Sequence, residues 1–485
     1  MAFGYSDLIA LDLGKLNTAV GDWRTMVGEL SKLRTEAADG MGKKSAAARW
    51  EGVNATVTRE FVHSTVKEFG DLYTQAKSIH AVLADAHNEL TGIQRRARTL
   101  SEEARRGNPE RAAGSDPGLL VTDGGDGTVK VFPLVCDAKG TSQRTLDMMQ
   151  WYADTLTALV AHAAEVDAAV TRALKAIHGN DPHNAGHATH TSLDQDQLPR
   201  AMKLAALGGD ASERQRDELR RLWQSLSPQA RAQLWARERD GLLAADTFAV
   251  QSKQVSADRG AGPHGSQHWS RGDFWKLMQA RGMAGMGDLA GNDDAARHMD
   301  HYLQGRGGTM GLNVDRMLTD DPALRQVTQD TVDDDREKWR QQALKAFEES
   351  GGQPVAIPIE SQPQSYSHKD RNWYLAVGSA MTNTTGVVTV TPDSTGQPRV
   401  ELSYQVNVWD RYNWDPGKVT PIAGTEVTDA DMARLHTTGL AQEYNLRGSG
   451  SVQHYDLGST ERLPKPGEAG EATPRFDSGR SEDRA

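Results

Sequence analysis

A chain of 485 residues is long enough for roughly two to four domains and can build a core without disulfide staples. Its formal net charge of −11 disfavours nucleic acid as a partner, because no overall cationic field gathers phosphates. The single cysteine, Cys136, excludes an intrachain disulfide and a thiolate metal cluster. No run approaches the roughly 18 apolar residues of a membrane span, and residues 1–15 lack the basic start of a Sec signal.

Two apolar stripes at helical spacing occupy the start of the chain. Between residues 6 and about 38, apolar positions three or four apart are Leu16, Val20, Trp23, Val27 and Leu30. After a break at the Gly-Met-Gly of residues 40–42, a longer stripe from about residue 46 to 105 contains Val62, Val66, Phe69, Tyr73, Ala76, Ile79, Leu83, Ala86, Leu90 and Ile93. The connection is short, so the two segments predict a long antiparallel helical hairpin with a coiled-coil seam.

The tripeptide Trp50-Glu51-Gly52 lies near this break. Gly52 permits a tight turn, and the indole of Trp50 is expected to cover the open end of the hairpin. Hairpin and tripeptide together resemble the actinobacterial Trp-x-Gly (WXG, ESX-like) substrates of type VII secretion. The resemblance implies secretion without a cleavable signal peptide. It also implies that the hairpin binds a helical partner protein or the secretion machinery, with Trp50 and Gly52 as binding residues.

The resemblance extends to about residue 245. It includes strands at residues 119–124 and 127–131, a third helix at about 143–178, and the segment Leu-Trp-Gln-Ser-Leu-Ser-Pro at 222–228. Similar proteins continue into an α/β-hydrolase domain, but no Gly-x-Ser-x-Gly motif is present here, so that chemistry is not carried over. The expected Tyr-x-x-x-Asp/Glu export signal is also missing after the second helix. Tyr366 and Asp370 match its letters in a Ser/Gln/Pro-rich segment, which we interpret as coincidence.

Four histidines crowd the segment after the third helix: His178, His183, His187 and His190. On a helix they would suit zinc, but Pro182 and Gly186 favour a loop. We therefore predict a flexible His-rich linker at residues 181–211 and no metal site. Helical patterns then recur at residues 217–226, 228–239, 273–281, 293–303 and 323–349, with another linker at 251–268. They predict a helical domain over residues 212–353.

Beyond a Pro/Gln/Ser-rich connection at residues 354–367, the apolar period changes to two. Residues 400–408 alternate strictly and predict a half-buried antiparallel strand, paired with 387–391 across a loop at 392–398. Residues 373–379 predict a third strand. Thr428 and Asp431 predict a capped helix that ends near Leu440.

The predicted fold is therefore multidomain and mainly α. A hairpin with a third helix covers residues 1–180, and the linker and helical domain follow. A small α+β domain with antiparallel strands covers 365–448, and residues 449–485 form a disordered tail.

The densest chemistry follows the strand at residues 400–408. Candidate catalytic residues are Asp410, Tyr412, Asp415 and His436, and candidate binding residues are Arg411 and Lys418. Carboxylates, a phenol, cations and an imidazole suit phosphoryl or glycosyl chemistry. The same residues also suit a structural corner, since Asp and Asn form turns and aromatic residues cover core edges.

The segment loosely resembles the toxin domains of the colicin M type, which cleave a lipid-linked cell-wall precursor. Asp410 and Tyr412 match, Asn413 replaces the second acid, and the His-Arg pair is absent unless His436 substitutes.

Two main functions remain open. One is a secreted effector of the polymorphic-toxin kind, with a helical export and partner-binding N-terminus, an effector domain and an associated immunity protein. The alternative is a noncatalytic surface or assembly protein whose C-terminal sheet binds a partner. A third reading is a cytoplasmic coiled-coil adaptor that is never exported. None of the three requires a cofactor.

Overall fold

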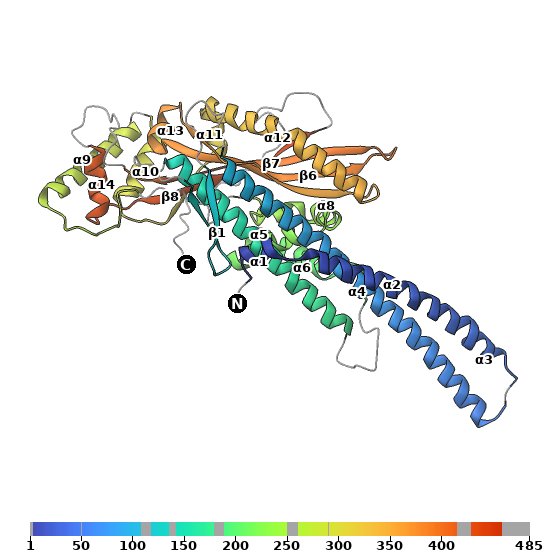
Figure 1. The fold of residues 1–485 in the computed structure, drawn as a ribbon. Coiled ribbons are helices and arrows are strands. Elements are labelled where there is room, and N and C mark those ends of the chain that lie inside the picture. Colours follow the sequence, from blue (N-terminus) through green and yellow to red (C-terminus); the bar gives the residue numbers. More distant parts are fainter. Residues whose placement is uncertain are drawn as a thin grey trace. The chain divides into compact units, whose positions relative to one another are not determined.

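The computed structural model describes residues 3–49, 51–107, 118–134, 142–178, 189–249, 260–289, 291–414 and 428–457. The chain divides into two compact units (Figure 1). The first unit comprises Met1–Arg106, Leu120–Lys130 and Thr155–Ala245, and the second comprises Gly107–Leu119, Val131–Asp154 and Asp246–Ala485. The expected class is confirmed in outline: the chain is mainly helical, with a sheet of largely antiparallel strands near its C-terminus.

Long helices dominate the chain up to residue 245. In order, the elements are α1 Tyr5–Ala10, α2 Leu13–Glu36, a π-helix at Ala37–Gly42, α3 Lys43–Ala47, α4 Val53–Arg106, β1 Leu119–Asp123, β2 Val129–Pro133, α5 Gln143–His178, α6 Asp194–Ala205, a 3-10 turn at Gly208–Asp210, α7 Glu213–Ser225 and α8 Pro228–Ala244. The expected strand pair and third helix are confirmed as β1, β2 and α5.

The predicted helical hairpin is present. Helix α2 packs along α4 in the antiparallel sense (Figure 1), and every stripe residue of both helices is at least partly buried. The expected break at residues 40–42 is wrong. The Lys43 N–H donates to the Ala38 carbonyl, and an Asp39–Lys43 ion pair spans the glycines, so helical structure continues to Ala47. The reversal follows Ala47, the last residue of α3, and precedes Val53, the first residue of α4.

The predicted linker at residues 181–211 is also wrong in part. Residues 194–205 form α6, whose first turn holds Asp194 and Asp196, where acids complement the helix dipole. The Asp194 carboxylate accepts from the Ser227 N–H, which ties α6 to the start of α8. Ser227 caps α8 and Pro228 occupies its first turn, as the sequence predicts. Of the histidine cluster, His183 and His187 lie outside the described residues.

The second unit combines helices with a seven-stranded sheet. Its elements are α9 Arg271–Leu289, α10 Asp293–Leu303, β3 Thr309–Gly311, α11 Val314–Asp320, α12 Pro322–Glu349, β4 Val355–Glu360, β5 Gln364–Ser367, α13 Arg371–Ala376, β6 Ser379–Pro392, β7 Pro398–Tyr412, α14 Asp429–Thr437, β8 Tyr444–Ser449 and β9 Gln453–Asp456.

The sheet is mixed. Its strand order is β3-β8-β7-β6-β4, with β5 paired to β6 and β9 paired to β7. All pairings are antiparallel except β3 with β8, which is parallel. The predicted hairpin is confirmed as β6 and β7, which pair from Met381 opposite Trp409 to Pro392 opposite Pro398. Asp393 closes its loop by accepting from the N–H groups of Thr395 and Gln397.

One hydrophobic core joins the helices after residue 270 to this sheet. It contains Leu324 and Trp339 of α12, Val388 of β6 and Leu402 of β7, all buried. The expected boundary between a helical domain at 212–353 and an α+β domain at 365–448 is therefore wrong. The sequence period changes at this point because the chain passes from helix to strand within one core.

Four further expectations about this unit are wrong. The connection at residues 354–367 contains β4 and β5, and residues 371–376 are helical because the Asp370 carboxylate caps the Trp373 N–H. The tail expected from residue 449 includes β9, which pairs with β7. Residues 260–268 of the expected second linker bond to α14 through Gly265 and Gln267.

Leu324→Ala and Val388→Ala test the single core. Each removes a fully buried side chain, from α12 and β6, and should lower the free energy of unfolding by about 2 kcal/mol or more. We expect both variants to shift the same transition in thermal melts followed by tryptophan fluorescence. Separate transitions, one for each variant, would show that the helices and the sheet are independent domains.

Candidate functional site

The candidate residues at 410–412 belong to a strand and not to a turn. Strand β7 continues to Tyr412, and its register places Asp410 opposite Leu446, Arg411 opposite Asn445 and Tyr412 opposite Tyr444. Successive side chains of a strand point to opposite faces. Asp410 and Tyr412 therefore share one face of the sheet, and Arg411 lies on the other.

Tyr412 is a core aromatic residue. Its ring stacks on Tyr444 with 5.0 Å between centroids and meets Trp414 edge-on at 6.1 Å. Burial holds the pKa of the Tyr412 phenol well above its ordinary value, which does not suit an acid or base near neutral pH. Asp410 lies on the same face, and its charge helps burial to raise the pKa of the Tyr366 phenol. Asp415 and Lys418 lie outside the described residues.

Arg411 forms an ion pair with a residue that the sequence analysis missed. Its Nη2 lies 3.2 Å from Oε2 of Glu443, which directly precedes β8. Glu443 is buried, and its Oε1 also accepts from the Ala261 N–H at 2.8 Å. A buried carboxylate requires such partners, because leaving water is costly for a charge. No periodicity marks Glu443, since its partners come from distant segments.

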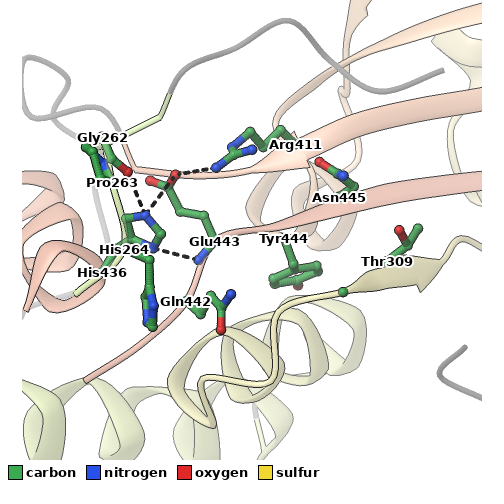
Figure 2. A pocket seen from close by; sticks show the side chains of 11 residues that line it. Gly262, Pro263, His264, Thr309, Arg411, His436, Gln442, Glu443, Tyr444 and Asn445 are labelled. Carbon is green, nitrogen blue, oxygen red and sulfur yellow. Dashed lines mark hydrogen bonds and ion pairs between the residues drawn. The ribbon is translucent and has the colours of Figure 1, made fainter. Parts of the chain in front are cut away.

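His436 meets Glu443 and the segment at residues 260–265 (Figure 2). Its Nε2 lies 2.9 Å from the Gly262 carbonyl, and its Nδ1 lies 3.0 Å from the Glu443 backbone nitrogen. A carbonyl only accepts and an amide only donates, so the ring is neutral, with its proton on Nε2. Burial lowers the pKa of His436, against the opposing effect of the Glu443 carboxylate.

A glycine makes the approach to Glu443 feasible. Gly260 has φ of +57°, and a Cβ at this position would collide with the Glu443 carboxylate. The segment after it is then held by backbone bonds, since the Gly265 N–H donates to the His436 carbonyl and the Gln267 N–H to the Thr437 carbonyl. The capping box of Thr428 and Asp431 fixes the start of α14, as the sequence predicts.

These residues surround a pocket of about 470 Å³. Figure 2 shows His436 and Glu443 at one end of it, Arg411 and Asn445 next to each other, and Thr309 at the other end. Among the described residues, Arg411 Nε and Asn445 Oδ1 are both buried and without a hydrogen-bond partner. The two residues are register partners on neighbouring strands. An acceptor beside Nε–H and a donor beside Oδ1, such as the oxygen and the proton of a hydroxyl, would satisfy these atoms.

A second buried network lies among residues that do not line this pocket. Asp321 Oδ2 is 2.7 Å from His368 Nδ1, and His368 Nε2 is 2.5 Å from the Tyr366 hydroxyl. All three residues are buried. Burial lowers the pKa of His368 although Asp321 opposes the shift. Tyr366 thus serves the core, and Asp370 caps α13.

The turn of the hairpin presents an exposed apolar row. Val53, Val57 and Phe61 lie four residues apart on α4, with 81%, 58% and 67% of their surface exposed. Gly52 precedes them with φ of +97°, a conformation that favours glycine, and a Cβ there would meet nothing within 4 Å. Trp50, expected to be buried at the hairpin mouth, lies outside the described residues.

His436→Gln tests the neutral imidazole. Burial lowers the folded pKa, so the stabilisation is complete above the ordinary histidine value of about 6.5 and is lost as pH falls towards the folded value. The variant should melt at a lower temperature than wild type at pH 8 and lose less stability between pH 7 and 5. Burial also lowers the pKa of His298, to about 3, so the stability of both proteins still falls somewhat as the pH is lowered. Equal slopes in melts at stepped pH would contradict the assignment.

Comparisons with protein-family models, curated proteins and solved structures return no match for this chain. Within its described part, no three or more His, Cys, Asp or Glu side chains converge on a metal position. No helix in the same ranges is long and apolar enough to span a membrane.

Proposed function

We propose that this chain is a modular secreted protein of the type VII kind. Its helical hairpin serves export and binds a helical partner, and its second unit is an effector module that binds a small polar ligand. The exposed row of Val53, Val57 and Phe61 carries the proposal, because it lies beside the Trp-x-Gly turn where the resemblance locates partner binding.

Water is an unfavourable environment for such a row. Side chains spaced by four form one strip along a helix, and a strip of this kind fits the groove of a partner helix or helix pair. Further along the same helix, Val82, Ala86 and Ile93 are buried, so α4 covers its apolar residues where it packs within the chain. The row at the turn is left for another molecule.

The geometry of the second unit favours binding over the catalytic set considered from sequence. Asp410 and Tyr412 lie on the face of β7 that packs against the core. On the opposite face Arg411 pairs with Glu443, and the Glu443 backbone N–H donates to the ring of His436. Both ring nitrogens of His436 are engaged by backbone groups, so accepting a proton on Nδ1 as a general base would cost the hydrogen bond from the Glu443 N–H. The paired Arg411 and Glu443 instead form a preorganised wall with two unpaired polar atoms beside it.

The double variant Val57→Asp/Phe61→Asp tests the hairpin. Both side chains are mostly exposed, so the melting temperature should stay within a few degrees of wild type. In a host with a type VII system, we expect the amount in the culture medium to fall about tenfold or more, because two charges enter an apolar interface.

The matched control is Thr58→Asp/His63→Asp. These exposed positions lie on the same stretch of α4, away from the row, and carry a similar change of charge. The control should be exported as wild type is. Equal export of all three proteins, without cell lysis, would remove the row from the export function.

Asn445→Leu and Asp410→Asn separate the two readings of the second unit. A small hydroxylated ligand that raises the melting temperature of the wild-type chain should bind Asn445→Leu about tenfold more weakly, through loss of a buried hydrogen bond. Asp410→Asn should retain that ligand, because Asp410 faces the other side of the sheet. Loss of binding or growth inhibition in Asp410→Asn, with an unchanged fold, would instead support the catalytic effector.

A further inference from the structure

Helix α9 has two contrasting faces. Leu277, Ala280 and Ala284 are buried in the core of the second unit. The outer side carries Phe274, Trp275 and Met278, which are 47%, 69% and 44% exposed, and Trp269 just before the helix is 57% exposed. We call these four residues the aromatic face of α9.

Large aromatic side chains are costly to leave in water. Phe274 and Met278 are one turn apart, and Trp275 lies between them, so their side chains form a continuous strip. Tryptophan is also the side chain most suited to a boundary between water and hydrocarbon, since its ring is apolar and its N–H needs a polar partner. The aromatic face thus combines residues typical of an interfacial helix.

The exposed charges of α9 between residues 271 and 285 are positive, and Asp431 of α14 pairs with Lys276 beside them at 3.2 Å. Arg271 lies one turn before Trp275, Arg281 lies one turn after Met278, and both are exposed. Between residues 268 and 285 the sequence contains one acid, Asp273, which is buried and paired with Arg434. A stretch without an exposed acid contrasts with the net charge of −11 for the whole chain. This local charge complements an anionic surface.

We propose that the aromatic face of α9 docks on the surface of an anionic lipid bilayer, with α9 parallel to the membrane plane. Trp269, Phe274, Trp275 and Met278 enter the boundary between headgroups and acyl chains, and Arg271 and Arg281 bind lipid phosphates. This docking is independent of the proposed roles of the hairpin and the pocket.

The fold holds α9 ready for such contact. Its inner face is fixed in the core, and two bonds from the Arg434 guanidinium to Asp273 secure its first turn. Asp273 also accepts from the backbone and hydroxyl of Ser270, next to Trp269. Docking therefore requires little ordering of the backbone, which would otherwise oppose binding.

Vesicle flotation of the full chain tests the proposal. We expect binding to vesicles of phosphatidylcholine with phosphatidylglycerol, weakened by salt, and little binding to phosphatidylcholine alone. Phe274→Ser/Trp275→Ser should lower the apparent partition coefficient about tenfold or more, since each side chain loses its apolar contact. Arg271→Glu/Arg281→Glu should abolish the preference for anionic vesicles.

The control is Val57→Ser/Phe61→Ser, which removes equally exposed apolar residues from α4 and should leave flotation unchanged. Absence of binding to either vesicle, or equal binding to both, would overturn the proposal. So would a lipid-free dimer of the wild-type chain in sedimentation that becomes monomeric in Phe274→Ser/Trp275→Ser, because a second copy would then cover the aromatic face.

Discussion

The long antiparallel pairing of β6 with β7 determines which side chains of the second unit can meet. Twelve consecutive register pairs, from Met381 with Trp409 to Pro392 with Pro398, leave no freedom to slip by one residue without turning the core face outward. The pairing of β8 with the end of β7 inherits this register. Arg411 is thereby directed to the face where Glu443 arrives, and Asp410 and Tyr412 are directed to the aromatic core.

The buried carboxylate of Glu443 then organises everything around the pocket. The carboxylate binds Arg411 of β7 and the Ala261 N–H, and the backbone N–H of the same residue donates to His436 of α14. Removing one partner would leave a buried charge uncompensated, which costs more than the pair itself contributes. The glycine at position 260 and the neutral tautomer of His436 are both consequences of this arrangement. These bonds orient the polar wall of the pocket before any ligand arrives, which favours binding.

Sequence patterns within a single helix or strand predicted the secondary structure well. Contacts between segments far apart in the sequence could not be predicted. The apolar stripes at helical spacing predicted the hairpin. The alternation of apolar and polar residues predicted the central parts of β6 and β7. However, Trp409 interrupted the alternation, so the predicted strand stopped early. The real strand continues because both of its faces are buried there, and Trp409 itself is buried on the polar side. A turn was therefore expected at Asp410, and the wrong residues were grouped into one site.

Local preference was also overruled by capping and by tertiary contact. The aromatic residues near Trp373 favour a strand, but the Asp370 cap starts a helix. The sequence identified His436 through its capped helix but paired it with Asp410 in place of Glu443. Nothing in the sequence around Glu443 indicates that its carboxylate binds the backbone of Ala261, 182 positions away.

The protonation of His436 tests the central claim most directly, because the two backbone hydrogen bonds to this ring are compatible with only one neutral tautomer. Nitrogen NMR of imidazole-labelled protein reports the proton on each ring nitrogen. Burial lowers the pKa of His436, so the structure requires a neutral ring protonated on Nε2 at pH 8 and at pH 7. A ring protonated on Nδ1, or an imidazolium already present at pH 7, would contradict the account.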